Sequence, residues 1–293
     1  MTLREWWVLA RPPTLPASVA PVAVGVAAGA LAGSVSWLLT GVMLAVALLL
    51  QIGTNMANEY ADFRRGVDQA DSVGIAGFLV TGHMTAPEIR RWAAGTFLAA
   101  LLLGMVLVAA RGLWLLGLGA LGASAAGLYN AGPRPLSATP FGEAVVFLIM
   151  GPIEVVASEL AAVGRFTPAG VLASLAVGCT VASILMANNL RDRLPDRDRG
   201  RRTVAVLLGP RAAQRGLEAL VAVGLLLPLL FGAASLLPIT AGGPALLLPW
   251  AWARLRTLAR PEGLAKSVLV AGRIHLWSGL LLALGLAAGV WVR

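Results

Sequence analysis

The acidic residues of this chain gather at two places, and this clustering is the clearest sign of chemistry in the sequence. Seven of its 14 acidic residues fall within positions 55–71 and 188–203. Both stretches contain the pattern Asn-x3-Asp-x5-Asp, first at Asn58, Asp62 and Asp68 and then at Asn188, Asp192 and Asp198. The two copies begin 130 residues apart, an offset that indicates a weak internal duplication of the kind found in membrane bundles.

The spacing within each copy suggests a cation site. Residues four apart lie on one helical face, so Asn58 with Asp62, and Asp192 with Asp196, would each aim two oxygen ligands at one spot. Like charges so placed repel unless a cation lies between them, and Mg²⁺ prefers oxygen ligands. Arginines in the same stretches suit phosphate oxygens, and they include Arg64, Arg65 and Arg201. The combination predicts a Mg²⁺-bridged diphosphate site; the alternative is solvated loop charges that pair with nearby arginines.

Composition indicates the kind of protein that must position these residues. Of 293 residues, 58% are hydrophobic and 13% are charged, whereas a soluble domain carries about 25% charge. This excludes a soluble globular protein and indicates a polytopic membrane protein. With one cysteine, Cys179, and two histidines, neither an internal disulfide nor a Cys/His metal cluster is expected. The net charge of +9 is scattered, which argues against a nucleic-acid partner.

Hydropathy predicts an all-α membrane protein with nine transmembrane helices, because a bilayer core needs about 20 apolar residues per helix. We expect one polytopic domain over residues 1–293, with motif loops at 61–91 and 191–215. Small residues in the fourth span, such as Gly117, Gly119 and Gly122, suit close helix packing. The expected spans are 14–33, 38–60, 92–110, 112–131, 141–163, 169–190, 216–237, 239–255 and 270–292.

The basic residues orient these spans. With the N-terminus in the cytoplasm, all of the 23 Lys and Arg residues fall on the cytoplasmic side except Arg111, Arg165 and Arg293. Cytoplasmic loops carry an excess of Lys and Arg, so this partition predicts that the N-terminus and both motif loops are cytoplasmic. The protein is accordingly expected in the cell (inner) membrane, with its site opening toward the cytoplasm.

With these motifs the sequence resembles the UbiA superfamily of intramembrane aromatic prenyltransferases, which carry two Asp-rich motifs on a nine-helix fold. Within that superfamily it looks most like the 1,4-dihydroxy-2-naphthoate polyprenyltransferases of menaquinone biosynthesis. The matching stretches are Leu50 to Asp71, Tyr129 to Leu136 with its Gly132-Pro133-Arg134-Pro135, Gly142 to Phe147, and Asn188 to Gly209. The resemblance implies a polyprenyl diphosphate donor, an aromatic acceptor and Mg²⁺.

The resemblance also implies roles for individual residues. Asn58, Asp62, Asp192 and Asp196 would hold Mg²⁺ and the diphosphate. Arg11 matches a family arginine, Arg201 stands where the family usually has a lysine, and Glu59 stands where Asp is commoner. We expect further substrate contacts from other residues of the matching stretches, namely Asn55, Arg64, Arg65, Asp68, Asp71, Asn188 and Asn189. Arg134 is the candidate partner for an acceptor carboxylate.

Several other polar residues lie in apolar surroundings. Tyr60 lies inside the first motif, where we favour a role in the site. Tyr129 could stabilise an allylic cation through its ring, or it is an ordinary interfacial tyrosine. Glu143 and Glu154 lie within one expected span, where an acid is a functional hypothesis by default. Glu143 would either bond near the acceptor or cap its helix.

Two other interpretations remain open. A cation-coupled transporter would also place Asp and Asn in the membrane, but it predicts polar groups near span midplanes. Both motifs here lie instead at the expected cytoplasmic ends of their spans. Within the enzyme class, 4-hydroxybenzoate and homogentisate are alternative acceptors to the dihydroxynaphthoate. A noncatalytic scaffold would leave both Asp clusters without a purpose.

Overall fold

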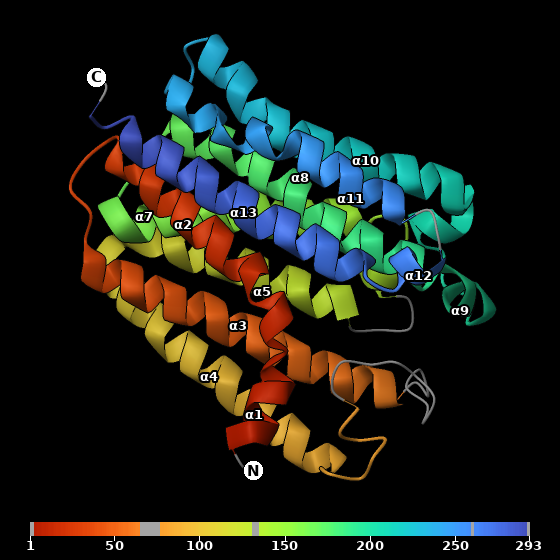
Figure 1. Cartoon of the computed structure of the whole chain (residues 1–293). Coiled ribbons are helices and arrows are strands. Elements are labelled where there is room, and N and C mark those ends of the chain that lie inside the picture. Colours follow the sequence, from red (N-terminus) through yellow and green to blue (C-terminus); the bar gives the residue numbers. More distant parts are fainter. Residues whose placement is uncertain (1–2, 65–76, 131–134, 259–260, 292–293) are drawn as a thin grey trace.

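The computed structural model describes residues 3–64, 77–130, 135–258 and 261–291, and the regular secondary structure of the described part is all helical, without strands (Figure 1). The α-helices are α1 (Leu3–Ala10), α2 (Pro16–Ala30), α3 (Trp37–Arg64), α4 (Ala86–Arg111), α5 (Leu113–Asn130), α6 (Gly142–Leu148), α7 (Glu154–Val163), α8 (Pro168–Arg191), α9 (Arg193–Asp198), α10 (Val204–Ala233), α11 (Leu248–Thr257), α12 (Pro261–Leu264) and α13 (Ser267–Ala288). Short segments of other helical type connect them: η1 (Pro12–Thr14), η2 (Leu136–Ala138), η3 (Ile149–Ile153) and η4 (Ile239–Leu247).

Six of the described helical segments are long and apolar enough to cross a membrane. A seventh candidate is the pair Trp6–Thr14 and Pro16–Ala30, which is bent by 58°. The bend follows from Pro12, Pro13 and Pro16, because proline has no N–H to donate and its ring obstructs the preceding turn. The all-helical class and the multi-pass membrane character are therefore confirmed.

Two expected spans are less regular than their hydropathy suggested. The apolar part of α5, Leu113–Tyr129, is shorter than the six long helices. The segment expected at 239–255 divides into η4 and α11, with Pro244 inside the first and Pro249 in the first turn of the second. In addition, α10 begins at Val204 and is kinked at Gly209, whose φ is 81°, so the segment expected as a loop to 215 is partly helical. The count of nine spans stays a prediction.

Close helix packing occurs at other glycines than those expected. Gly117, Gly119 and Gly122 have no neighbouring atom within 4 Å of where a Cβ would lie, so the prediction of close approach there is wrong. Gly25 of α2, for example, approaches the backbone of α7 at the carbonyl oxygen of Val155. Because hydropathy treats all apolar helix faces alike, it could not tell a lipid-facing glycine from a packed one.

The fifth span is interrupted in a way that matters for function. Residues Ile149–Ile153 form a π-helical turn between α6 and α7, and Pro152 lies inside it. Proline cannot donate the regular helical hydrogen bond, so the turn widens. Gly151 lets this widened turn pack on α8, since a Cβ there would lie 2.6 Å from the Cα of Gly178. The turn ends directly before Glu154, which thereby faces the bundle from the first residue of α7.

Candidate active site at one end of the bundle

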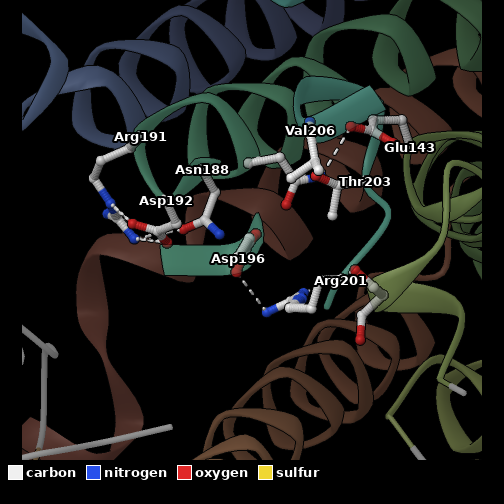
Figure 2. Close-up of polar contacts among 10 residues, drawn as sticks. Glu143, Asn188, Arg191, Asp192, Asp196, Arg201, Thr203 and Val206 are labelled. Atoms are coloured by element: carbon white, nitrogen blue, oxygen red, sulfur yellow. Dashed lines mark hydrogen bonds and ion pairs between the residues drawn. The ribbon is translucent and has the colours of Figure 1, made fainter. Parts of the chain in front are cut away.

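The second acidic motif lies where α8 ends and α9 begins, at the same end of the bundle as the end of α3 (Figure 1). Arg191 grips Asp192 bidentately, with 2.7 Å from Nε to Oδ1 and 2.7 Å from Nη2 to Oδ2. The same guanidinium donates to Oδ1 of Asn188 at 2.8 Å, as Figure 2 shows. The Asn and Asp of the motif are thus joined through one arginine.

Asp196, one turn further on, has a different arginine partner. Its Oδ1 lies 3.3 Å from Nη1 of Arg201, and its side chain is only 3% exposed. Burial raises the pKa of the Asp196 carboxyl above its ordinary value, and the positive charge of Arg201 opposes that rise. The two carboxylates predicted to share one helical face therefore each contact a separate cation, a disposition suited to binding a polyanion with a metal.

Arg201 also ties the second motif to the segment after α5. Its Nη2 donates to the carbonyl oxygen of Ser137 at 2.8 Å, and the N–H of Arg202 donates to the carbonyl of Ala138 at 2.8 Å. Thr203 then caps α10 by accepting from the N–H of Val206 at 3.4 Å. The segment following Gly132-Pro133-Arg134-Pro135 is in this way docked beside Asp196. Arg134 itself lies outside the described residues.

The first motif is described only in part. Asn58 lies in the last third of α3, and its Oδ1 is buried without a hydrogen-bond partner. Asp62 lies on the same helix, but its side chain falls outside the described part of the chain. Arg64 is exposed at the end of α3. The remaining predicted residues of this motif, Arg65, Asp68 and Asp71, also fall outside the described residues.

Glu59 contributes more to the site than its place in the motif suggested. Its Oε2 accepts from Nη2 of Arg11 at 2.6 Å, and its Oε1 accepts from the N–H of Phe78 at 2.9 Å. One carboxylate therefore connects the bend before α2, the motif helix α3 and the turn before α4. The only sequence signal was its position inside the motif, because both partners lie far away in the chain.

Asn55 and Tyr60 have surroundings that differ from those of the motif carboxylates. Asn55 donates through Nδ2 to the carbonyl oxygen of Ala10 at 2.9 Å and to Oγ1 of Thr14 at 2.8 Å, so it holds the α1–α2 bend. Tyr60 packs on an apolar cluster that includes Met56. Both side chains thus support the end of α3 on which Asn58 lies.

Tyr129, Glu143 and Asn189 lie close together on the other side of the site. Asn189 donates through Nδ2 to Oε1 of Glu143 at 2.9 Å, and both side chains are buried. The Tyr129 side chain lies in the neighbourhood of Glu143 and of the Arg201 guanidinium. Glu143 is in the first turn of α6; Figure 2 places it across from Asp196 and Arg201.

The donors at this end fit the Mg²⁺ that the resemblance implies. Asp192 and Asp196 offer carboxylate oxygens, and the unpartnered Oδ1 of Asn58 is a buried hard ligand. Within the described ranges no three His, Cys, Asp or Glu side chains converge. Mg²⁺ is usually held by one or two carboxylates together with substrate phosphates rather than by an all-protein cage, so these donors are compatible with such a site.

Comparison with known proteins agrees with this arrangement. The sequence profile of the UbiA prenyltransferase family matches residues 18–269. The chain is 38% identical to the 1,4-dihydroxy-2-naphthoate octaprenyltransferase of Bacillus subtilis, over 74% of this chain and 70% of the relative. It is 37% identical to the protein of the same name from Mycobacterium tuberculosis, over 75% of each chain.

A solved structure shares the fold. A UbiA homologue from Archaeoglobus fulgidus, solved bound to GPP and Mg²⁺, superposes with a TM-score of 0.66 at 17% sequence identity. The match covers 95% of this chain and 99% of that one. The family profile, the identity to relatives and the shared fold together show that this protein belongs to the UbiA prenyltransferase family.

Proposed function

We propose that the protein transfers a polyprenyl group from a polyprenyl diphosphate to 1,4-dihydroxy-2-naphthoate, in a Mg²⁺-dependent step of menaquinone biosynthesis. The observation that carries the proposal is the burial of Asp196 beside Arg201, since a solvated loop charge would be exposed, at the end of the bundle where the first motif also lies (Figure 1). A site with two carboxylates and two guanidinium groups suits a metal-bound diphosphate. The naphthoate relatives support the acceptor.

Each proposed residue contributes through its charge or its oxygen ligands. Asn58, Asp62, Asp192 and Asp196 hold Mg²⁺, which when bound neutralises charge on the leaving diphosphate. Further residues contact the diphosphate or support these ligands, namely Arg11, Asn55, Arg64, Arg65, Asp68, Asp71, Asn188, Asn189 and Arg201. The guanidinium groups stabilise the negative charge that develops as the allylic C–O bond breaks.

The acceptor lies beside this site in our proposal. Arg134 pairs with the acceptor carboxylate, since a carboxylate that leaves water needs a cationic partner. The docking of Ser137 on Arg201 supports this role, because it fixes the segment directly after Arg134 at the second motif. Tyr129 stabilises the allylic cation with its ring, and Tyr60 supports the motif helix.

We further propose that the chain is one polytopic domain with nine spans, its N-terminus in the cytoplasm and its site open to the cytoplasmic face of the cell membrane. The partition of basic residues supports this orientation. This orientation separates the two parts of the prenyl donor, because the charged diphosphate stays at the water-exposed end of the bundle while the prenyl chain lies among apolar helices.

Prenyl transfer by the purified protein tests the proposal. Asp192→Ala should lower turnover by orders of magnitude, whereas Asp198→Ala should not, because Asp198 is exposed and pairs only loosely with Arg197. EDTA should abolish the wild-type activity and Mg²⁺ should restore it. Full activity of Asp192→Ala in EDTA would refute the metal site. Transfer to 4-hydroxybenzoate or homogentisate but not to the naphthoate would refute the acceptor and leave the enzyme class intact.

A further inference from the structure

A row of polar side chains leads from the first motif into the interior of the bundle. Asn58, Asn55 and Gln51 are spaced by three and four residues on α3 and so share one face. From Asn58 to Gln51 the helix rises about 10 Å. Polar side chains so deep in an apolar span are costly, and they mark functional paths more often than packing.

The inner end of this row contacts a buried acid from another helix. The Ser18 hydroxyl on α2 donates to Oε1 of Gln51 at 3.5 Å and lies near the carboxyl group of Glu154. Glu154 is the first residue of α7, directly after the π-helical turn. Three helices, α2, α3 and α7, thus place a hydroxyl, an amide and a carboxyl group together inside the bundle.

The Glu154 carboxyl group is incompletely satisfied. Its Oε1 is buried and has no hydrogen-bond partner, although the side chain as a whole is only partly buried. A buried acceptor without a donor is expensive, so this oxygen is suited to a ligand that brings an N–H or O–H.

Glu159, on the same helix, is a buried acid whose hydrogen bonds serve a structural role. It is fully buried, and its oxygens accept from the Thr167 hydroxyl at 2.6 Å and from the Thr167 N–H at 3.1 Å. Glu159 thereby fixes the connection between α7 and α8. Of these two acids, which lie five residues apart on α7, only Glu154 retains an unpaired buried oxygen.

We propose that Glu154, supported by Ser18 and Gln51, binds a ring hydroxyl group of the aromatic acceptor. The inference rests on the proposed function and adds a second anchor to it. A ring hydroxyl that donates to Oε1 places electron density on the aromatic carbons, which makes them better nucleophiles. The depth is suitable, because the rise of about 10 Å along α3 from Gln51 to Asn58 is comparable to the length of a bicyclic ring with its substituents.

Kinetics of Glu154→Leu test the proposal, with Glu159→Leu as the matched control, because leucine is of similar size and offers no hydrogen-bond acceptor. Loss of the acceptor oxygen should raise the KM for dihydroxynaphthoate about tenfold or more, while the KM for the prenyl diphosphate stays unchanged. Ser18→Ala should raise the acceptor KM in the same direction by less. Glu159→Leu should lower the unfolding temperature without an acceptor-specific change in KM.

Monomethyl ethers of dihydroxynaphthoate provide a second measurement, and its first part needs only the wild-type protein. In equilibrium dialysis without prenyl donor, blocking one of the two hydroxyls should weaken binding to the wild type. That discrimination should disappear in Glu154→Leu. Equal acceptor KM in Glu154→Leu and wild type, or equal binding of both ethers and the parent to the wild type, would overturn the inference. Wild-type protein that prenylates no aromatic acceptor would instead refute the proposed function.

Discussion

Arg11 and Glu59 form a buried ion pair, with 2.6 Å between Nη2 and Oε2, that joins the bend before α2 to the motif end of α3. Glu59 is 1% exposed and Arg11 16%. Arg11 adopts a left-handed backbone conformation with φ of 50°, which non-glycine residues rarely occupy. The pair therefore holds a strained residue at the mouth of the bundle, and it fixes the guanidinium that we assign to the diphosphate.

Breaking this pair should destabilise the protein. Glu59→Ala leaves the Arg11 charge uncompensated and the Phe78 N–H without its acceptor. Removing one partner of a buried pair costs about 3–5 kcal/mol, so the unfolding temperature in detergent should fall clearly. Glu59→Gln keeps an acceptor for the Phe78 N–H, so its unfolding temperature should fall less. An unchanged unfolding temperature in Glu59→Ala would show that the pair contributes nothing.

The pH dependence of the protein's stability should reveal the burial of the Asp196 carboxyl group. Because burial raises its pKa in the folded protein, the metal-free folded state binds this proton more readily than the unfolded state. The free energy of unfolding therefore increases as pH falls through the raised pKa, and it decreases again as pH rises. In EDTA at neutral pH, Asp196→Asn should be more stable than wild type, with the difference vanishing below about pH 4. Asp198→Asn, at an exposed position, should show no such trend.

Protons should also compete with Mg²⁺ at Asp196. As pH falls toward the raised pKa, the Mg²⁺ concentration needed for half-maximal activity should increase, because the protonated carboxyl is a poor ligand. Titrations of Mg²⁺ at several pH values measure this directly. A requirement for Mg²⁺ that is constant between neutral pH and pH 5 would argue against Asp196 as a ligand.

Arg201 should be needed as an arginine and not merely as a positive charge. Its guanidinium reaches both Asp196 and the Ser137 carbonyl, whereas lysine offers a single point of contact. Arg201→Ala should raise the KM for prenyl diphosphate about tenfold to a hundredfold, and Arg201→Lys should recover only part of it. Arg197→Ala, at a position 60% exposed, is the control and should behave as wild type.

Substitution by alanine should change the protein's stability in opposite directions at Gly25 of α2 and Gly119 of α5. A Cβ on Gly25 would collide with the Val155 carbonyl, so Gly25→Ala should cost about 1–3 kcal/mol through overpacking. Gly119 has open space around it, and alanine there should stabilise α5 slightly, by up to about 1 kcal/mol. The unfolding temperatures of both variants test this prediction. Similar shifts in both would contradict the close packing of α2 on α7.

Cysteine labelling tests the proposed orientation. In a Cys179→Ser background, Asp198→Cys lies at the motif end of the bundle and Ser34→Cys follows the opposite end of α2. A membrane-impermeant maleimide should label position 34 in intact cells, and position 198 only in inverted vesicles. The reverse pattern would place the motif end outside the cytoplasm and refute the orientation.

The sequence by itself determined the class of the protein and the place of its chemistry. Membrane spans are local, since a run of apolar residues must lie in lipid wherever it occurs, and this is why α3, α4, α8 and α13 were predictable. The acidic motifs were equally local, because their spacing along one helix already decides which side chains share a face. Family resemblance then added the diphosphate and the metal.

Only the tertiary structure decided which distant residues meet. Glu59 finds Arg11 across 48 residues, and Arg201 finds Ser137 across 64. Neither pairing leaves a periodic trace in the sequence, because it depends on how whole helices pack. The same holds for Glu154, whose unpaired oxygen follows from a π-helical turn at Pro152 and from the approach of α2. Hydropathy placed that acid in the membrane, but packing alone determined what it faces.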